Sequence, residues 1–115
     1  MLAQRKRKYG NTPVVLDGFK FSSKAEAKRY GELKLLERGG EIAGLRLHTS
    51  YPLVATSPWL RGKGMNVGSY VDDFSYELQG ERVVEDVKGC KTAVYRLKKK
   101  LVKALYGIDV TEIDA

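Results

Sequence analysis

Two neighbouring acidic stretches hold the residue types best suited to chemistry, and a lysine closes the second one. The first, residues 70–74, contains Asp73, and the second contains Asp86 two positions before Lys88. Successive side chains of a strand point to opposite faces, so Asp86 and Lys88 share a face if this stretch is a strand. Asp73 adds a second carboxylate from the preceding strand, and carboxylate oxygens hold divalent cations. A lysine beside such a cation can meet a bound anion, an arrangement typical of phosphodiester cleavage.

A third carboxylate, Glu26, lies at the start of an expected helix. Ser23 and Glu26 match the capping-box pattern, in which the acidic side chain reaches back to the amide of the cap. The helix is expected to run to about Arg38, and Gly39-Gly40 ends it. Glu26 lies one turn before Tyr30, so its side chain points towards the buried stripe. Capping is one role and a functional carboxylate is the other, and the two are compatible because a first-turn glutamate can face a site.

Periodicity and turn residues predict the remaining elements. They are a hairpin over 14–21, a strand or bent pair of strands over 45–48 and 52–55, a loop over 57–66, one long strand over 67–78, a turn at 79–80, a strand over 81–88, a helix over 93–106 and a short strand over 108–113. The second helix is expected to bury Val94, Leu97, Leu101 and Leu105. His48, the single histidine, is interpreted as an ordinary strand residue, with a role as general base as the alternative.

The composition bounds the class of protein. A chain of 115 residues suits one domain, which we expect to span residues 14–115. Lys and Arg number 21 against 14 Asp and Glu, and the resulting net charge of +7 favours a polyanionic partner, most often nucleic acid. A single cysteine, Cys90, excludes an internal disulfide and a cysteine-rich zinc site. Because no apolar run suits a signal peptide or a membrane span, we expect a cytoplasmic protein without membrane contact.

Basic residues gather in three places that are candidates for contact with nucleic acid. Residues 1–13 are expected to form a flexible basic arm, the loop over 57–66 carries cations beside Trp59, and the second helix has a lysine-rich face. The candidate residues are Arg5, Lys6, Arg7, Lys8, Arg61, Lys63, Lys91, Tyr95 and Lys98. The alternatives in these three places are a solubilising tail, a hairpin tip with one tucked aromatic side chain, and a solvated helix face.

The order helix, three strands, helix, strand, with acidic residues on the first helix and on the second and third strands, resembles the PD-(D/E)xK nuclease superfamily. The matching residues are Glu26 in Ser23-Lys24-Ala25-Glu26, Asp73 in Tyr70-Val71-Asp72-Asp73-Phe74, and Asp86-Val87-Lys88. The segments and the basic arm are also similar to a small phage-encoded, Holliday junction resolvase-like branch of that superfamily. The resemblance spans about residues 19–113. It implies a restriction-endonuclease-like core of order αβββαβ, with a mixed sheet flanked by helices, here preceded by the short hairpin.

At two positions the choice lies between neighbouring acidic residues. The chain has Asp72-Asp73 where the superfamily has Pro-Asp, and Asp73 is preferred because it precedes an aromatic residue, as the family's ligand usually precedes an aromatic or apolar one. Asp86 is preferred to Glu85 because only Asp86 shares a strand face with Lys88.

The resemblance implies a metal-dependent deoxyribonuclease. Asp73, Asp86, the Val87 carbonyl and Glu26 would hold Mg²⁺ or Mn²⁺, Glu26 either directly or through water, and Lys88 would steady the attacking water or the transition state. We expect a homodimer that selects branched DNA such as a Holliday junction, in phage DNA replication, recombination or packaging. The alternative is a noncatalytic nucleic-acid-binding domain in which Asp73, Asp86 and Lys88 form a structural network.

Overall fold

The computed structural model describes residues 13–115, so the predicted basic arm with Arg5, Lys6, Arg7 and Lys8 lies outside the described residues, apart from Pro13. In chain order the elements are β1 (Val14–Leu16), β2 (Phe19–Phe21), α1 (Lys24–Arg38), β3 (Ala43–Leu47), β4 (Ser50–Ala55), a short 3₁₀ helix (Pro58–Leu60), β5 (Met65–Val71), β6 (Phe74–Leu78), β7 (Glu81–Lys88), α2 (Ala93–Tyr106) and β8 (Thr111–Asp114). Between residues 13 and 115, no helix has the length and apolar character needed to cross a membrane.

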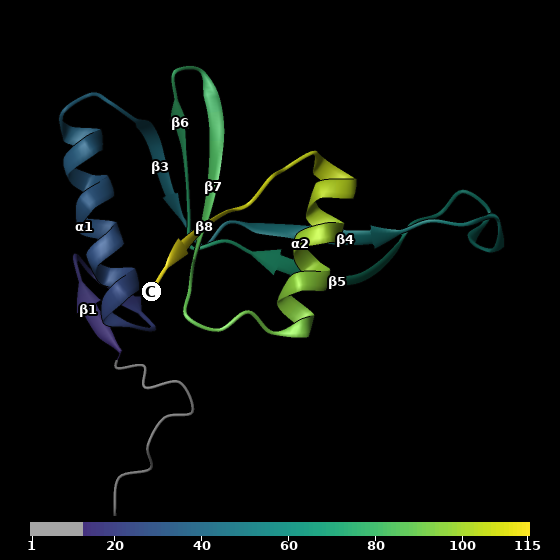
Figure 1. Cartoon of the computed structure of the whole chain (residues 1–115). Coiled ribbons are helices and arrows are strands. Elements are labelled where there is room, and N and C mark those ends of the chain that lie inside the picture. Colours follow the sequence, from purple (N-terminus) through teal and green to yellow (C-terminus); the bar gives the residue numbers. More distant parts are fainter. Residues whose placement is uncertain (1–12) are drawn as a thin grey trace, which may run out of the picture.

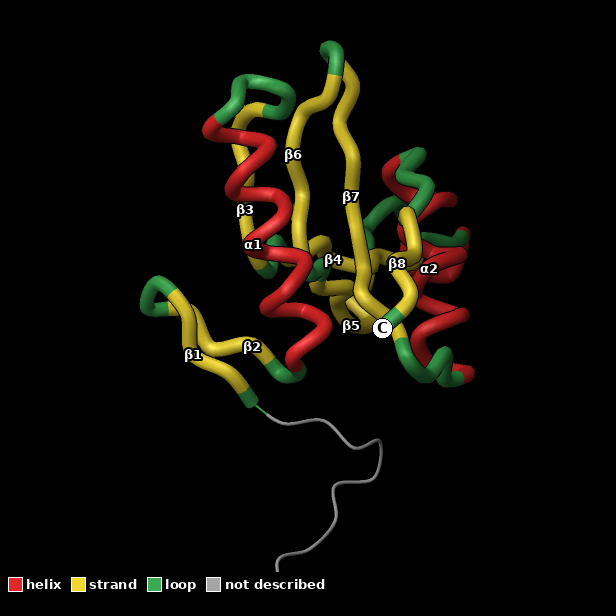
Figure 2. The backbone as a smooth tube through the Cα atoms, turned by 60° about the vertical axis from the view of Figure 1, so that its left-hand side comes forward, coloured by secondary structure: helices red, strands yellow, loops and turns green. Residues whose placement is uncertain are grey.

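The central sheet is mixed, and its four strands lie in the order β3-β6-β7-β8. β7 and β8 are parallel, whereas β3, β6 and β7 pair antiparallel with their neighbours. β1 and β2 form the predicted hairpin before α1, and β4 and β5 form a second hairpin outside the central sheet (Figure 2). The predicted mixed α/β architecture, with two helices and a preceding hairpin, is confirmed.

Helix α1 covers one face of the central sheet (Figure 2). It begins where predicted, because the Ser23 hydroxyl accepts a hydrogen bond of 3.1 Å from the Glu26 amide. Its apolar stripe packs on the hairpin and on the strands beneath. Burying a side chain of the size of Leu33, which has no exposed surface, stabilises the fold by about 2 kcal/mol. The buried cluster on this face consists of Phe21, Ala27, Tyr30, Leu33, Ile42, Phe74 and Tyr76.

Helix α2 lies on the other side of the molecule, across β4 and β5 (Figure 1). Its ends are as predicted: the Thr92 hydroxyl caps the start, and Gly107 follows the end with a positive φ of 69° that suits glycine. The predicted buried stripe is wrong, because Val94, Leu97 and Leu105 are exposed. The helix turns Tyr95 and Val102 inward instead, onto a second cluster that also contains Tyr51, Leu53, Tyr70, Val84 and Val110. A hairpin two strands wide covers only part of the apolar surface of a helix.

The single long strand predicted over 67–78 is wrong, because the chain changes partners at Asp72 and Asp73. β5 pairs with β4, whereas β6 pairs with β3 and β7. At the crossing, the Asp72 amide donates to the Thr49 carbonyl at 3.0 Å and the Asp73 amide donates to the Glu85 carbonyl at 3.1 Å. The two acidic residues therefore stand at the point where the β4–β5 hairpin meets the central sheet.

The β4–β5 hairpin extends away from the central sheet, and its tip is remote from the Asp72-Asp73 crossing (Figure 1). The tip corresponds to the loop predicted over 57–66 and contains the short helix Pro58–Leu60. Trp59 within it is 91% exposed, so the tip does not bury its aromatic side chain.

Candidate functional site

Glu26 is held at the start of α1 by groups outside the helix. Its side chain is buried, and Oε2 accepts hydrogen bonds from the Ser22 hydroxyl at 2.7 Å and from the Ser22 amide at 3.3 Å. The other oxygen, Oε1, lies 3.1 Å from Nε2 of His48. The expected capping box is therefore only half formed, because Ser23 caps the helix while the glutamate side chain turns to Ser22 and His48. Oε1 faces a cluster of other ionisable side chains.

Asp73 lies beside this carboxylate at the crossing between β5 and β6. Its Oδ2 accepts a hydrogen bond of 2.7 Å from the Val87 amide, which fixes the side chain against β7. Burial, a hydrogen bond shared with Asp86 and the negative charges of Asp86 and Glu26 raise the pKa of Asp73 to about 8. Three carboxyl groups thus crowd together, and a positive charge between them would relieve their repulsion.

Asp86 and Lys88 share one face of β7, as strand alternation predicts. Asp86 is buried, its Oδ2 accepts a hydrogen bond of 2.7 Å from the Tyr70 hydroxyl, and its Oδ1 lies 3.4 Å from Nζ of Lys88. Nζ of Lys88 also lies 4.4 Å from the centre of the Tyr95 ring, a cation–π distance. Lys88 is only partly exposed, so these contacts hold its ammonium group in one place.

Two open pockets meet at Lys88. The larger, about 540 Å³, is lined by Asp73, Val87 and Lys88 together with the residues just before α1. The smaller, about 300 Å³, is lined by Asp86, Lys88 and residues of β5 and α2. Asp73 and Asp86 therefore face solvent-accessible space on the two sides of Lys88, with room for a phosphodiester group.

His48 joins Glu26 and Asp73 in one group. Each of the three side chains offers one ligand atom, and these atoms all lie within 4.8 Å of one another. The prediction of an ordinary strand histidine is wrong, because β3 ends at Leu47 and His48 lies in the bend that follows. The sequence alone gave little sign of this group, because a single histidine next to a strand does not indicate which acidic residues lie near it in the fold.

The neighbouring acidic residues, Asp72 and Glu85, point elsewhere and are fully engaged by other groups. Asp72 has no exposed surface and accepts hydrogen bonds from the Thr49 amide and the Tyr51 hydroxyl. Glu85 accepts two hydrogen bonds from the guanidinium group of Arg29, at 2.8 and 2.7 Å, and one from Tyr76. Both carboxylates therefore have structural roles in the interior of the fold.

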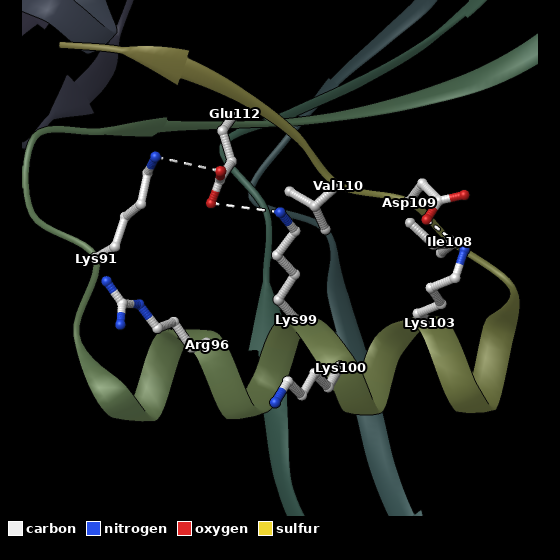
Figure 3. Close-up of a pocket in the computed structure, with 9 residues that line it drawn as sticks. All are labelled: Lys91, Arg96, Lys99, Lys100, Lys103, Ile108, Asp109, Val110 and Glu112. Carbon is white, nitrogen blue, oxygen red and sulfur yellow. Dashed lines mark hydrogen bonds and ion pairs between the residues drawn. The ribbon is translucent and has the colours of Figure 1, made fainter.

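A basic groove of about 400 Å³ runs between α2 and β8 (Figure 3). Nζ of Lys91 and of Lys99 lie 3.3 and 3.5 Å from the carboxylate of Glu112, and Lys103 pairs with Asp109. In the described part of the chain, no ion pair engages the exposed side chains of Arg96 and Lys100. The groove thus keeps positive charge available to an anion.

The other predicted DNA contacts lie in different surroundings. Lys98 lines the smaller pocket beside Asp86, whereas Arg61 and Lys63 follow the short helix in the tip of the β4–β5 hairpin, which extends away from the central sheet (Figure 1). Tyr95 is buried, its ring faces Lys88, and its hydroxyl donates to Glu112 at 2.8 Å. The structure therefore gathers Lys88, Lys98 and Tyr95 near the cluster, places Lys91 in the basic groove, and leaves the hairpin tip apart.

Residues 6–112 match the family described as "Protein of unknown function (DUF1064)", and the chain belongs to that family. No curated protein and no solved structure matches the chain.

Proposed function

We propose that this member of a family of unknown function is a divalent-cation-dependent DNA endonuclease of the PD-(D/E)xK type. The observation that carries the proposal is that Asp73 lies beside both Glu26 and Asp86, which come from two other elements, and that Asp73 and Asp86 line the two open pockets next to Lys88. Burying a charged carboxylate is costly, and Glu26 and Asp86 are buried on either side of the half-buried Asp73, so their charges are unfavourable unless a cation balances them. Such an arrangement is typical of a metal-assisted hydrolytic site.

The donor set fits a hard divalent cation. Glu26 and Asp73 offer carboxylate oxygens in one group, Asp86 lies beside Asp73, and Val87, whose carbonyl is a further candidate, lines the larger pocket with Asp73. Mg²⁺ and Mn²⁺ both accept such oxygens. A bound cation would lower the pKa of a coordinated water and offset the charge of the scissile phosphate. The protein's own part is to hold these oxygens close together beside a pocket that is open to the backbone of DNA.

Lys88 is proposed to act on the reacting phosphate. Asp86 and the Tyr95 ring hold its ammonium group at the junction of the two pockets, so its positive charge is placed before substrate arrives. A preorganised charge stabilises a transition state more than a mobile one, because no reorganisation is needed as negative charge develops. Tyr70, whose hydroxyl donates to Asp86, and Tyr95 are positioning residues in this proposal.

DNA is the proposed substrate because basic groups surround the cluster. Lys98 lies at the pocket that contains Asp86, and the groove with Lys91, Arg96 and Lys100 lies on the other face of α2. These residues would contact phosphates, which gives affinity that depends on salt and carries little sequence information. Branched DNA such as a Holliday junction is the proposed preferred form, and phage DNA replication, recombination or packaging in the host cytoplasm is the proposed setting.

A homodimer is proposed because two strands of a junction must be cut and each chain carries one cluster. The exposed apolar side chains of Val94 and Leu97 on α2, with Val71 on β5, support this proposal. Because Val71 and Val94 also line the smaller pocket with Asp86, the proposed contact is centred on Leu97 and leaves that pocket open to DNA. Sedimentation of the protein and of Leu97→Glu tests the proposal, which predicts a dimer for the first and a monomer for the second.

Cleavage of labelled four-way junction, flap and linear duplex DNA in Mg²⁺, Mn²⁺ or EDTA tests the proposed activity. We expect cutting in either cation and none in EDTA. Asp86→Asn should lose cutting by a factor on the order of 10³, because it removes one charged ligand and the partner of Lys88. Glu41→Gln, the same chemical change at an exposed position beyond the far end of α1, is the matched control and should cut normally.

Cutting that persists in EDTA, or in Asp86→Asn, would overturn the nuclease proposal. The second candidate function is a noncatalytic nucleic-acid-binding domain, which the ion pair between Lys88 and Asp86 at 3.4 Å favours, since this pair also serves as a structural contact. DNA that is bound but remains uncut under every condition would support this second function.

A further inference from the structure

His48 makes two contacts that tie it to two different acidic residues. Its amide donates a hydrogen bond of 3.3 Å to the backbone carbonyl of Asp73, and its Nε2 lies 3.1 Å from Oε1 of Glu26. The side chain is 42% exposed, so the imidazole lies at the boundary between the buried carboxylate and solvent. A group at this boundary can reach a ligand that enters from solution.

The backbone of His48 adopts a left-handed conformation with φ of 55°. Residues other than glycine adopt this conformation rarely, although histidine, asparagine and aspartate tolerate it more often, and such residues concentrate at functional sites. Here the left-handed residue ends β3 and places the imidazole against Glu26. A glycine would relieve the backbone cost and lose the ring, so the backbone conformation alone does not account for a histidine.

We propose that His48 is a metal ligand together with Glu26 and Asp73, and that its nitrogen makes the site bind Mn²⁺ in preference to Mg²⁺. This inference rests on the proposed nuclease function and names the cation that the site takes. Ser22 occupies Oε2 of Glu26 and leaves Oε1 facing the imidazole, so one oxygen and one nitrogen already lie side by side.

The spacing of the three ligand atoms suits one ion. With metal–ligand bonds of about 2.1 Å, two ligands of an octahedral ion lie about 3 Å apart when adjacent and about 4.2 Å apart when opposite. The ligand atoms of Glu26, His48 and Asp73 lie within 4.8 Å of one another, so closing around an ion requires movements below about 1 Å. Asp73 lines an open pocket and the His48 side chain is partly exposed, so small rotations of these two side chains supply such movements.

The nitrogen donor decides the preference between cations. Mg²⁺ binds oxygen ligands almost exclusively and keeps several of its waters, so an imidazole adds little to its binding. Transition-metal ions accept imidazole readily, and Mn²⁺ accepts carboxylate oxygens as well. Mn²⁺ therefore gains from all three side chains, whereas Mg²⁺ gains from two.

Pulsed electron paramagnetic resonance of the Mn²⁺-bound protein tests the ligand directly. A coordinated imidazole produces ¹⁴N modulation, and because the chain contains a single histidine, untagged protein gives an unambiguous assignment. His48→Gly is the test variant, since glycine adopts the same backbone conformation without a donor. Gln79→Gly is the matched control, because Gln79 also has a positive φ, 53°, in the distant turn between β6 and β7.

We expect ¹⁴N modulation in the wild type and in Gln79→Gly, and none in His48→Gly. Mn²⁺ affinity, measured by calorimetry, should fall on the order of 10- to 100-fold in His48→Gly, with a change in Mg²⁺ affinity below about threefold. Bound Mn²⁺ without modulation, or unchanged Mn²⁺ affinity in His48→Gly, would overturn the inference and assign His48 to holding Glu26 by a hydrogen bond. Cation-dependent cutting would then still support the nuclease, whereas a wild type that binds neither cation would overturn both proposals.

Discussion

Asp72-Asp73 and Glu85-Asp86 are two pairs of adjacent acidic residues in the same part of the fold. The two members of each pair have different surroundings. Asp72 and Glu85 are each surrounded by donors: Tyr51 and the Thr49 amide for the first, Arg29 and Tyr76 for the second. Their sequence neighbours, Asp73 and Asp86, lie beside each other, and Asp86 also accepts a hydrogen bond from Tyr70 and pairs with Lys88. One position along each chain segment therefore separates a saturated carboxylate from a crowded one.

The difference separates carboxylates that stabilise this fold from carboxylates that we assign to the site. The guanidinium group of Arg29 neutralises Glu85, and this pairing raises the pKa of Arg29 above its ordinary value. Asp73 accepts a hydrogen bond from the Val87 amide, but burial and the negative charges of Asp86 and Glu26 raise its pKa, so its ionised form is unfavourable at neutral pH. We interpret Asp72 and Glu85, whose carboxylates are surrounded by donors, as structural residues. We interpret Asp73 and Asp86, whose carboxylates lie beside each other, as part of the site that a cation completes.

The largest expected effect is on cleavage, and it separates Asp73 from Asp72. Asp73→Asn should reduce the rate of cutting by a factor on the order of 10³, because it removes a charged cation ligand. Asp72→Asn should cut within about threefold of the wild type, because the amide oxygen still accepts the Thr49 hydrogen bond. Single-turnover cleavage of a labelled junction measures both rates. An equal loss of rate in the two variants would contradict the assignment of Asp72 to structure and Asp73 to the site.

The next effect is on stability, and it concerns the partners of Glu85 and Asp86. Arg29→Met should lower the free energy of unfolding by about 3 kcal/mol, because it leaves the buried Glu85 carboxylate without its cation. Lys88→Met should cost clearly less, because Asp86 keeps its hydrogen bond from Tyr70. Urea denaturation measures both values.

Arg46→Met, at an exposed position on β3, is the control for the loss of a positive charge and should leave the urea midpoint nearly unchanged. A Lys88→Met loss as large as that of Arg29→Met would assign Asp86 to the structural class.

A smaller effect comes from removing one donor of a saturated carboxylate. Tyr51→Phe should lower the free energy of unfolding by about 1–2 kcal/mol, because the buried Asp72 loses one of its two hydrogen bonds. Cleavage should stay near the wild-type rate. Tyr70→Phe, the same change at the donor to Asp86, should reduce cleavage more than Tyr51→Phe does, and the reverse order would contradict the comparison.

The last prediction concerns the pH dependence of stability in the metal-free protein. The pKa of Asp73 rises from 3.8 to about 8 on folding, so the folded state keeps a proton that the unfolded state releases between these values. This contribution to stability is therefore present below about pH 4 and is lost as pH rises to about 8. In EDTA, the urea midpoint should fall more between pH 5 and pH 8 for the wild type than for Asp73→Asn. An equal fall in the two proteins would contradict the raised pKa.

Local patterns were enough to predict much of the fold. The helix start at Ser23, the ends of α2 and the turn before β7 all follow from residues adjacent in the sequence, because caps and turns are formed by short-range hydrogen bonds. Strand alternation likewise placed Asp86 with Lys88 and turned Glu85 to the opposite face, where it meets Arg29. These inferences hold because they depend on backbone geometry alone.

The break between β5 and β6 was hidden by a pattern that looks continuous. Tyr70, Asp72, Phe74 and Tyr76 are all buried at every second position, as in one strand. Yet Tyr70 packs in the cluster beneath α2, whereas Phe74 and Tyr76 pack beneath α1. A period of two reports that alternate residues are buried, and it carries no information on which neighbour buries them.

By itself, the sequence determined the types and approximate bounds of the elements, the basic excess, and the face that Asp86 shares with Lys88. The tertiary structure decided which residues from different elements meet: Glu26 from α1, His48 from the bend after β3, and Asp73 from the crossing. It also decided that α2 buries Tyr95 and Val102 in place of the predicted leucine stripe. The physical reason is that alternation and capping are local, whereas the packing of elements depends on contacts between residues far apart in the chain.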